Sequence, residues 1–285
     1  MKNQITDKIF EEERALYGIS DTEVFGCSFE GEADGESALK ECRSVRVHNC
    51  RFALRYPLWH CKDVSLHDCH MTDTCRAPLW YTEKATLRHC RILGTKALRE
   101  CDDTLIEDSV INSAEFGWRC KELKLRKCNI TSEYFLFEAS SVEINRLRLN
   151  GKYSFQYVDG MTLSDSVLNT KDAFWHAKNV TVTDSEINGE YLGWYSENLT
   201  LVNCRISGTQ PFCYCKGLRL INCTMESTDL AFEYSEVEAD VRGHIDSVKN
   251  PLSGYINADS IGEIITENSV MENDCKIHIR QGDTK

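Results

Sequence analysis

The sequence lacks the features that mark several large classes of protein. Its 285 residues include only four prolines, no run near the ~20 apolar residues of a membrane span, and no apolar signal segment near the N-terminus. Lysine and arginine total 33 against 45 aspartates and glutamates, a net charge of −12. Because phosphate binding needs clustered basic residues, this balance argues against a nucleic-acid partner. We expect a cytoplasmic protein that binds neither nucleic acid nor a membrane.

Motifs for catalysis and for metal binding are missing as well. No C-x₂-C pair occurs among the 15 cysteines, although structural zinc sites need four converging ligands. The N-T-D…D-D…H-G pattern of polygalacturonase-like enzymes and the R-x-P-x-x-R segment of pectate lyases do not occur either. The sequence therefore predicts no metal and no cofactor. It leaves open whether the protein is an enzyme and favours a non-enzymatic role.

What the sequence has instead is an internal repeat with a period of about 19 residues. The reference position of each repeat is a small or apolar residue, and the spacing is constant except for one longer step between Cys69 and Cys90. The reference residues are Cys50, Cys69, Cys90, Ser109, Cys128, Leu147, Ser166, Ser185, Cys204 and Cys223. The positions three before and two after the reference are always apolar, and polarity alternates around them. This period of two indicates a strand with one buried face.

A strand-rich repeat of this length predicts an all-β fold, a single-stranded right-handed parallel β-helix of about ten coils. Seven of the ten residues just before the reference are Asn or Asp, which tolerate the left-handed conformation of a tight corner. Residues 1–22 are predicted to form an N-terminal helical cap, because Ile9, Phe10, Ala15 and Leu16 have helical spacing. Regular coils are expected over 23–236, and degenerate closing coils with a C-terminal tail over 237–285, all in one domain.

The cysteines fall into columns of this repeat. A second column, eleven residues after the reference, is occupied by Cys, Ala, Ser, Val or Thr, a set defined by small size. A reduced cysteine packs as a small hydrophobe, so stacking in the core is the favoured interpretation. A metal site is the functional alternative and a disulfide framework the remaining one. The metal alternative would draw on His48, Cys50, His60, Cys61, His67, Cys69, His70, Cys213 and Cys215.

Three neighbouring columns just before the second cysteine column are rich in aromatic residues. One holds Leu, Phe or Gly, the next holds all five tryptophans, and the third holds mainly Tyr and His. Three adjacent positions cannot all face inward on a straight strand. Either the Trp column or the Tyr/His column is therefore exposed. We favour a corner that buries the Leu/Phe column together with the second cysteine column.

An exposed aromatic strip is the candidate functional surface in either case. Its candidate residues are Trp59, His60, Trp80, Tyr81, Trp118, Tyr157, Trp175, His176, Trp194, Tyr195 and Tyr214. Such a strip suits a homodimer or other protein interface, and it equally suits a carbohydrate ligand. The leading hypothesis is a non-enzymatic binding or scaffold protein. The alternative is a carbohydrate-binding or carbohydrate-active protein of lyase or hydrolase type, for which His60, Glu100, Glu138 and His176 could form an acid/base cluster.

Several phrases of the sequence resemble a known family. The FEEERALYG opening and the recurring PLWHCKD, PLWYTEK, FGWRCKE, FWHAKN and GWYSEN are similar to an uncharacterised bacterial family of right-handed β-helix proteins, known only as a domain of unknown function. The resemblance covers nearly the whole chain. It implies a pectin-lyase-like superhelix and implies no activity.

Overall fold

The structure is a computed structural model that describes residues 3–31 and 36–280. Every regular element in these residues is a β-strand, and the strands form a parallel β-solenoid of the right-handed type with about 14 turns. The chain divides into two compact units, Met1–Arg148 and Leu149–Lys285, called below the N-terminal and C-terminal units.

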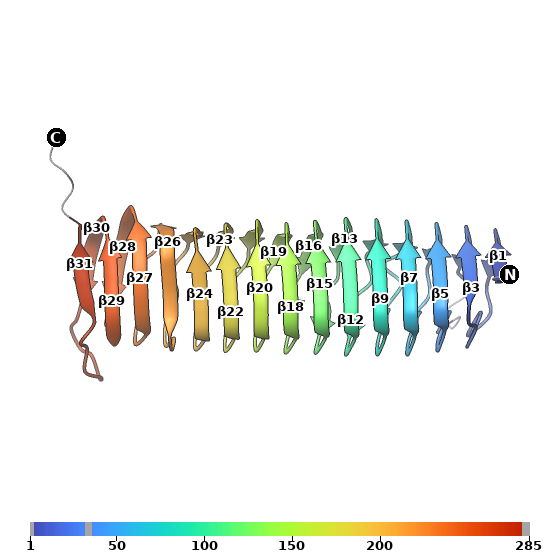
Figure 1. The fold of residues 1–285 in the computed structure, drawn as a ribbon, viewed down its shortest axis with the longest axis horizontal. Coiled ribbons are helices and arrows are strands. Elements are labelled where there is room, and N and C mark those ends of the chain that lie inside the picture. Colours follow the sequence, from blue (N-terminus) through green and yellow to red (C-terminus); the bar gives the residue numbers. More distant parts are fainter. Residues whose placement is uncertain (1–2, 32–35, 281–285) are drawn as a thin grey trace. The chain divides into compact units, whose positions relative to one another are not determined.

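In the N-terminal unit, one main strand per turn lies parallel to its counterparts in the neighbouring turns (Figure 1). These strands are β1 (Asn3–Thr6), β3 (Thr22–Phe25), β5 (Arg43–His48), β7 (Lys62–His67), β9 (Glu83–Arg88), β12 (Asp102–Glu107), β15 (Lys121–Arg126) and β18 (Ser140–Asn145). A second side is made by β2 (Ile9–Phe10), β4 (Ser28–Phe29), β6 (Arg51–Phe52), β8 (His70–Met71), β10 (Arg91–Ile92), β13 (Val110–Asn112) and β16 (Asn129–Ser132). A third is made by β11 (Ala97–Arg99), β14 (Glu115–Trp118) and β17 (Tyr134–Phe135).

The C-terminal unit repeats this plan, and β19 (Arg148–Gly151) spans the boundary between the units in the sequence. Its main strands are β20 (Asp159–Ser164), β22 (Lys178–Thr183), β24 (Glu197–Val202), β26 (Leu218–Glu226), β27 (Glu236–Arg242), β29 (Ser253–Ala258) and β31 (Lys276–Ile279). The second side is made by β21 (Val167–Asn169), β23 (Glu186–Asn188) and β25 (Arg205–Ser207). A separate parallel pair, β28 (His244–Lys249) and β30 (Ser260–Ile265), closes the last turns.

The core of each unit is a set of identical positions stacked from turn to turn. Val47 pairs with Leu66, and Leu66 pairs with Leu87, all of them buried. Phenylalanine rings stack inside both units, with centroids 4.8 Å apart for Phe29 and Phe52 and 4.9 Å apart for Phe155 and Phe174. The strict register follows from the period of two, because a slip by one residue would expose every core side chain.

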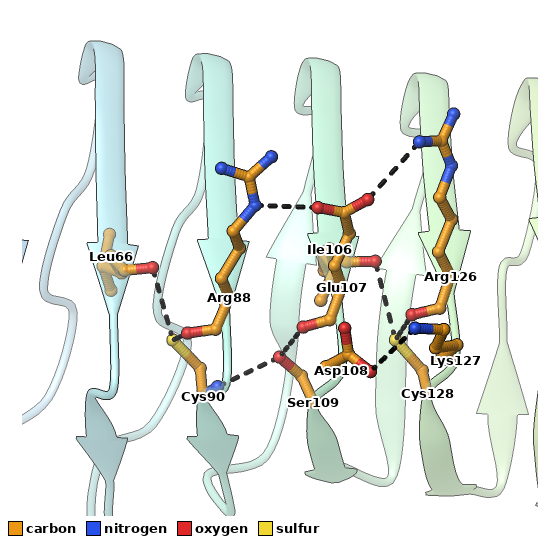
Figure 2. A network of polar contacts seen from close by, with 10 residues as sticks. All are labelled: Leu66, Arg88, Cys90, Ile106, Glu107, Asp108, Ser109, Arg126, Lys127 and Cys128. Atoms are coloured by element: carbon orange, nitrogen blue, oxygen red, sulfur yellow. Dashed lines mark hydrogen bonds and ion pairs between the residues drawn. The ribbon is translucent and has the colours of Figure 1, made fainter.

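Cysteine and serine share the reference column because both satisfy the same contacts (Figure 2). Ser109 Oγ accepts a hydrogen bond from the backbone N–H of Cys90 at 3.0 Å and donates one to the Glu107 carbonyl at 2.7 Å. Cys128 Sγ in the next turn makes the equivalent contact, 3.4 Å from the Arg126 carbonyl oxygen two residues before it. All 15 cysteines are free thiols, and all except the half-buried Cys275 are buried. Their packing is that of small core residues.

The expectation of an N-terminal helical cap is wrong. Residues Asn3–Thr6 form β1, which pairs in parallel with β3, and Phe10 is paired with Phe29. Of the apolar residues that suggested a helix, Phe10 and Ala15 are instead buried in the core of the solenoid. The expected number of about ten coils is also too low, since parallel turns extend from β1 to β31. Residues 281–285 of the predicted C-terminal tail lie outside the described residues.

Candidate functional site

The three aromatic columns lie at a corner where left-handed residues alternate with ordinary ones. Leu58 and His60 have φ angles of 59° and 55°, and Phe174 and His176 have 62° and 53°. This alternation turns successive side chains in directions that a straight strand forbids. Leu58 and Cys61 point into the core, Trp59 between them is half-buried, and His60 is exposed. The outermost aromatic groups of the corner are therefore the Tyr and His side chains.

In the N-terminal unit the half-buried column forms one continuous stack. The rings of Trp59 and Trp80 are parallel within 5°, with centroids 5.0 Å apart. The guanidinium of Arg99 lies between the next two rings, 4.5 Å from the Trp80 centroid and 4.8 Å from that of Trp118. Arg99 is held there by Glu115, whose carboxylate lies 3.0 Å away. A cation between two indole faces is a favourable arrangement, so Arg99 replaces a ring without breaking the stack.

Every indole N–H in the protein is already used for a hydrogen bond to a neighbouring turn. Trp80 Nε1 donates to the Lys96 carbonyl at 2.6 Å, Trp175 Nε1 to Tyr191 at 2.7 Å, and Trp194 Nε1 to Gln210 at 2.8 Å. Trp59 and Trp118 donate in the same way to the Ala77 and Tyr134 carbonyls. The tryptophans thus fasten adjacent turns together, and they retain no donor for a ligand.

In the N-terminal unit the outermost column lines a cavity of about 620 Å³. The rings of His60 and Tyr81 stack at 4.8 Å at one side of it. The ion pairs of Arg119 with Glu138 at 2.7 Å and with Glu100 at 3.7 Å continue the same column. The full lining is His60, Tyr81, Glu83, Glu100, Cys101, Asp102, Arg119 and Lys121, called below the His60 cavity.

Charge within the His60 cavity is mixed. The ammonium of Lys62 lies 2.8 Å from Glu83 and holds the pKa of that carboxyl below its usual value. The two carboxylates beside Arg119 raise the pKa of its guanidinium. Glu83 and Lys121 were not among the candidates from the sequence. Their signal was present, because they repeat at one position just after the second cysteine column.

In the C-terminal unit the outermost column forms an unbroken ladder of stacked rings. The residues of this Tyr/His ladder are Tyr157, His176, Tyr195, Tyr214 and Tyr234. Centroid distances along it are 4.9, 5.0, 4.8 and 5.8 Å, and the first three ring pairs are parallel within 8°. Tyr157 is 48% exposed and Tyr195 is 43% exposed. Tyr234 extends the ladder by one rung beyond the candidates from the sequence.

The stacking decides which chemistry the ladder can offer. Inside the stack each ring face is covered by the neighbouring rings, so a ligand meets ring edges, phenol hydroxyls and imidazole nitrogens. Burial is the largest cause that raises the pKa of the Tyr214 phenol, and the Glu233 carboxylate adds to it. Tyr214 therefore remains a neutral hydrogen-bonding group. A sugar that needs an open aromatic face finds none inside this ladder.

The candidates from the sequence fall into two groups. Trp59, His60, Trp80 and Tyr81 lie together in the N-terminal unit, and Trp118 joins them through Arg99. Tyr157, Trp175, His176, Trp194, Tyr195 and Tyr214 lie together in the C-terminal unit. Of the proposed acid/base cluster, His60 and Glu100 share the His60 cavity, whereas Glu138 is bound by Arg119 and His176 is stacked between Tyr157 and Tyr195.

Within residues 3–31 and 36–280, no group of three or more His, Cys, Asp or Glu side chains is arranged to hold a metal ion. The same residues contain no helix long and apolar enough to cross a membrane.

Comparison with known proteins identifies a family and several solved structures. A family model described as "Protein of unknown function (DUF3737)" matches residues 3–279. No curated protein matches the chain.

Several solved structures match the chain at low sequence identity. A mutant tailspike protein of E. coli bacteriophage HK620, in complex with a pentasaccharide, is 8% identical, with a TM-score of 0.43 over 90% of this chain and 60% of that one. The catalytic domain of a GH87 α-1,3-glucanase in complex with nigerose is 9% identical, with a TM-score of 0.47 over 100% of this chain and 65% of that one. HetL, a pentapeptide repeat protein from Nostoc sp. strain PCC 7120, is 11% identical, with a TM-score of 0.29 over 81% and 90% of the two chains. The chain thus spans less than two thirds of the tailspike and glucanase chains.

Proposed function

We propose, from the premise that the chain belongs to the DUF3737 family of proteins of unknown function, that this protein is a scaffold whose Tyr/His ladder binds a second copy of the chain. The observation that carries the proposal is the exposure of Tyr157 and Tyr195, at 48% and 43%, within a regular stack of rings. Tyrosine is among the residues enriched in protein interfaces, because it supplies apolar area and a hydrogen-bonding tip at a low entropic cost.

The regular pitch of the ladder favours a second copy as the occupant. Successive rings from Tyr157 to Tyr214 are 4.8–5.0 Å apart. Two identical ladders related by a twofold axis present the same pitch to each other, so each rung finds a matching partner across an isologous interface. The covered ring faces support a second copy over a sugar. A sugar stacks on an open ring face, whereas a second copy can pack against ring edges and hydroxyls.

Sedimentation velocity over a range of concentrations tests the proposal. The wild-type protein is expected to be a dimer, and the variant Tyr157→Ala/Tyr195→Ala to dissociate at least about tenfold more readily, since buried interface tyrosines commonly contribute more than about 1 kcal/mol each. Tyr255→Ala is the matched control, because Tyr255 is 39% exposed on β29 and lies outside the ladder. This variant is expected to dimerise like the wild type.

Two results would overturn the proposal. One is a wild-type protein that stays monomeric at every concentration. The other is a dimer that the ladder variant and the Tyr255 variant weaken equally. Thermal unfolding of both variants shows separately whether the fold survives the loss of two stacked rings.

The His60 cavity supports a second candidate function, the binding of a carbohydrate. Its volume of about 620 Å³ and its mixture of Glu83, Glu100, Asp102 and Tyr81 offer many hydrogen-bonding groups to a polyhydroxylated ligand. Trp59 and Trp80 form the aromatic corner beside it, so tryptophan fluorescence is expected to change when an oligosaccharide binds, and Glu100→Gln to weaken that response. No response to a broad glycan panel would remove this candidate.

A further inference from the structure

The last turns of the C-terminal unit bring a serine, a histidine and an aspartate into contact. Ser260 Oγ lies 2.9 Å from Nδ1 of His244, and Nε2 of the same imidazole lies 3.6 Å from Oδ1 of Asp246. We propose that Ser260 is a nucleophile, activated by His244 and oriented through Asp246, that accepts an acyl group from an ester. This assignment is independent of the Tyr/His ladder.

Strand pairing explains why the three side chains meet. His244 on β28 is in register with Ser260 on β30, so their side chains are neighbours on adjacent parallel strands. Ile245 between His244 and Asp246 is completely buried, which places these two on the outer face of β28 together. The contact of all three groups is thus built into the sheet rather than into a loop.

Gly262 has no side chain, and this leaves space for the imidazole of His244. A Cβ atom at this position would lie 2.6 Å from the Asp246 carbonyl oxygen and 3.4 Å from Nε2 of His244. Any larger residue would therefore press on the ring and on the strand behind it. The imidazole is also accessible, because His244 and Asp246 line a cavity of about 350 Å³ that Arg242 and Ser227 line as well.

The arrangement fits the roles of nucleophile, base and orienting group. The distance of 2.9 Å is within the range for proton transfer from a hydroxyl to a general base. The working tautomer carries its proton on Nε2, the nitrogen on the side of Asp246, and leaves Nδ1 free to accept. The ring is reversed relative to the serine protease arrangement, in which Nε2 faces the serine. Either ring nitrogen can act as the base, because the tautomer decides which nitrogen carries the proton and which accepts one.

The proposed step balances without a further reactant. As Ser260 Oγ forms a bond to the ester carbonyl carbon, its proton moves to Nδ1 of His244. When the tetrahedral intermediate collapses, the ester C–O bond breaks, the departing alkoxide takes the proton from Nδ1, and the acyl group remains on Ser260.

Labelling with a fluorophosphonate probe tests the assignment on the full-length protein. The probe forms an Oγ–P bond and releases fluoride, and peptide mapping is expected to find it on Ser260. Ser227 is the internal control, because it is an exposed serine that lines the cavity beside His244 and Asp246. His244→Ala is expected to slow labelling by about 100-fold or more, the usual size of a general-base contribution. Asp246→Asn is expected to slow it by less.

Absence of label on Ser260 would overturn the proposal, as would labelling that His244→Ala leaves unchanged or that is shared equally with Ser227. Circular dichroism of the His244→Ala variant distinguishes a lost base from a lost fold. Ser260→Ala provides the second check, because it removes only the hydroxyl and must abolish the label at this position.

Discussion

Glu107 is clamped between two arginines of neighbouring turns (Figure 2). Its Oε2 accepts a hydrogen bond from Arg88 Nε at 2.7 Å, and its Oε1 lies 3.4 Å from Arg126 Nη1. Although the position is on the outer face, the side chain is only 20% exposed. The hydrogen bond from Arg88 is the largest cause that lowers the pKa of this carboxyl, and Arg126 adds to the effect.

This lowered pKa predicts a loss of stability in acid. The contribution of Glu107 is complete above the pKa of an unfolded glutamate, about 4.3, and disappears as the pH falls through the lower folded value. Glu107→Gln is expected to lower the urea midpoint at pH 7, and its difference from wild type should shrink toward pH 3. Glu143→Gln is the control, because its pair with Lys124 is exposed and 3.9 Å long. Equal pH profiles for the two variants would contradict the account.

Three of the buried cysteines give the opposite dependence on pH. Burial is the main cause that raises the pKa of Cys50, Cys128 and Cys215, each to about 11. A raised folded pKa means that this contribution is complete below the unfolded value of about 8.5 and is lost as the pH rises toward about 11. The free energy of unfolding should therefore fall over that interval. Cys128→Ser should reduce this fall in the free energy of unfolding, because a serine hydroxyl does not ionise in this range. The substitution should fit the column, since Ser109 occupies the same position one turn earlier.

Thiol reactivity checks the same point directly. In the native protein at pH 8, a thiol reagent should leave every cysteine unmodified except the half-buried Cys275, and unfolding should release the rest. Rapid modification of several thiols in the folded state would show that the columns are not packed in the core.

At the scale of the elements, the aromatic corner is stabilised by indole hydrogen bonds between turns. Trp175→Phe keeps a six-membered ring against Trp194, whose centroid lies 5.4 Å away, and removes the pyrrole ring with its donor to Tyr191. The expected loss is at least about 1 kcal/mol, the net contribution of one hydrogen bond, measured by urea unfolding. Gln156 donates to the Asp172 carbonyl from the same column, which indicates that the bond is a general requirement of the corner. Unchanged stability would contradict this role.

The repeat and its buried columns could be predicted from the sequence, but the first and last turns could not. The regular turns keep one constant step except between Cys69 and Cys90, whereas the pairing of Val24 with Val47 and of Ile256 with Ile277 requires longer steps. The pairing of Ala239 with Ile256 requires a shorter one. These uneven steps hide the periodicity outside the middle of the chain. Without it, the apolar spacing over residues 9–16 resembled a helix.

The candidate surface was predicted in composition but not in orientation. Which of three adjacent columns faces outward depends on the alternating φ angles at residues such as Leu58 and His60. Leucine and histidine rarely adopt the left-handed conformation, so their identity alone does not indicate it. The covered ring faces and occupied indole donors likewise follow from contacts between turns. A single sequence does not reveal those contacts.

At the scale of the whole molecule, the net charge of −12 keeps separate copies apart at long range, and salt screens this repulsion. Association through the Tyr/His ladder must therefore rest on short-range contacts. The ladder has a regular pitch and two strongly exposed rungs, Tyr157 and Tyr195. Dimerisation should accordingly strengthen, not weaken, when the ionic strength is raised from about 50 mM to about 500 mM. A dimer that dissociates with salt would point to an ionic interface elsewhere.

Oxidative dityrosine cross-linking of mixed unlabelled and ¹⁵N-labelled protein tests the central claim most directly. Stacked tyrosines within one copy also couple, but only a contact between copies joins one light peptide to one heavy peptide. The proposed interface predicts mixed light–heavy cross-links at Tyr157, Tyr195 or Tyr214 and none at Tyr255. Mixed cross-links confined to Tyr255, or their complete absence at concentrations where the protein is dimeric, would contradict the role of the ladder.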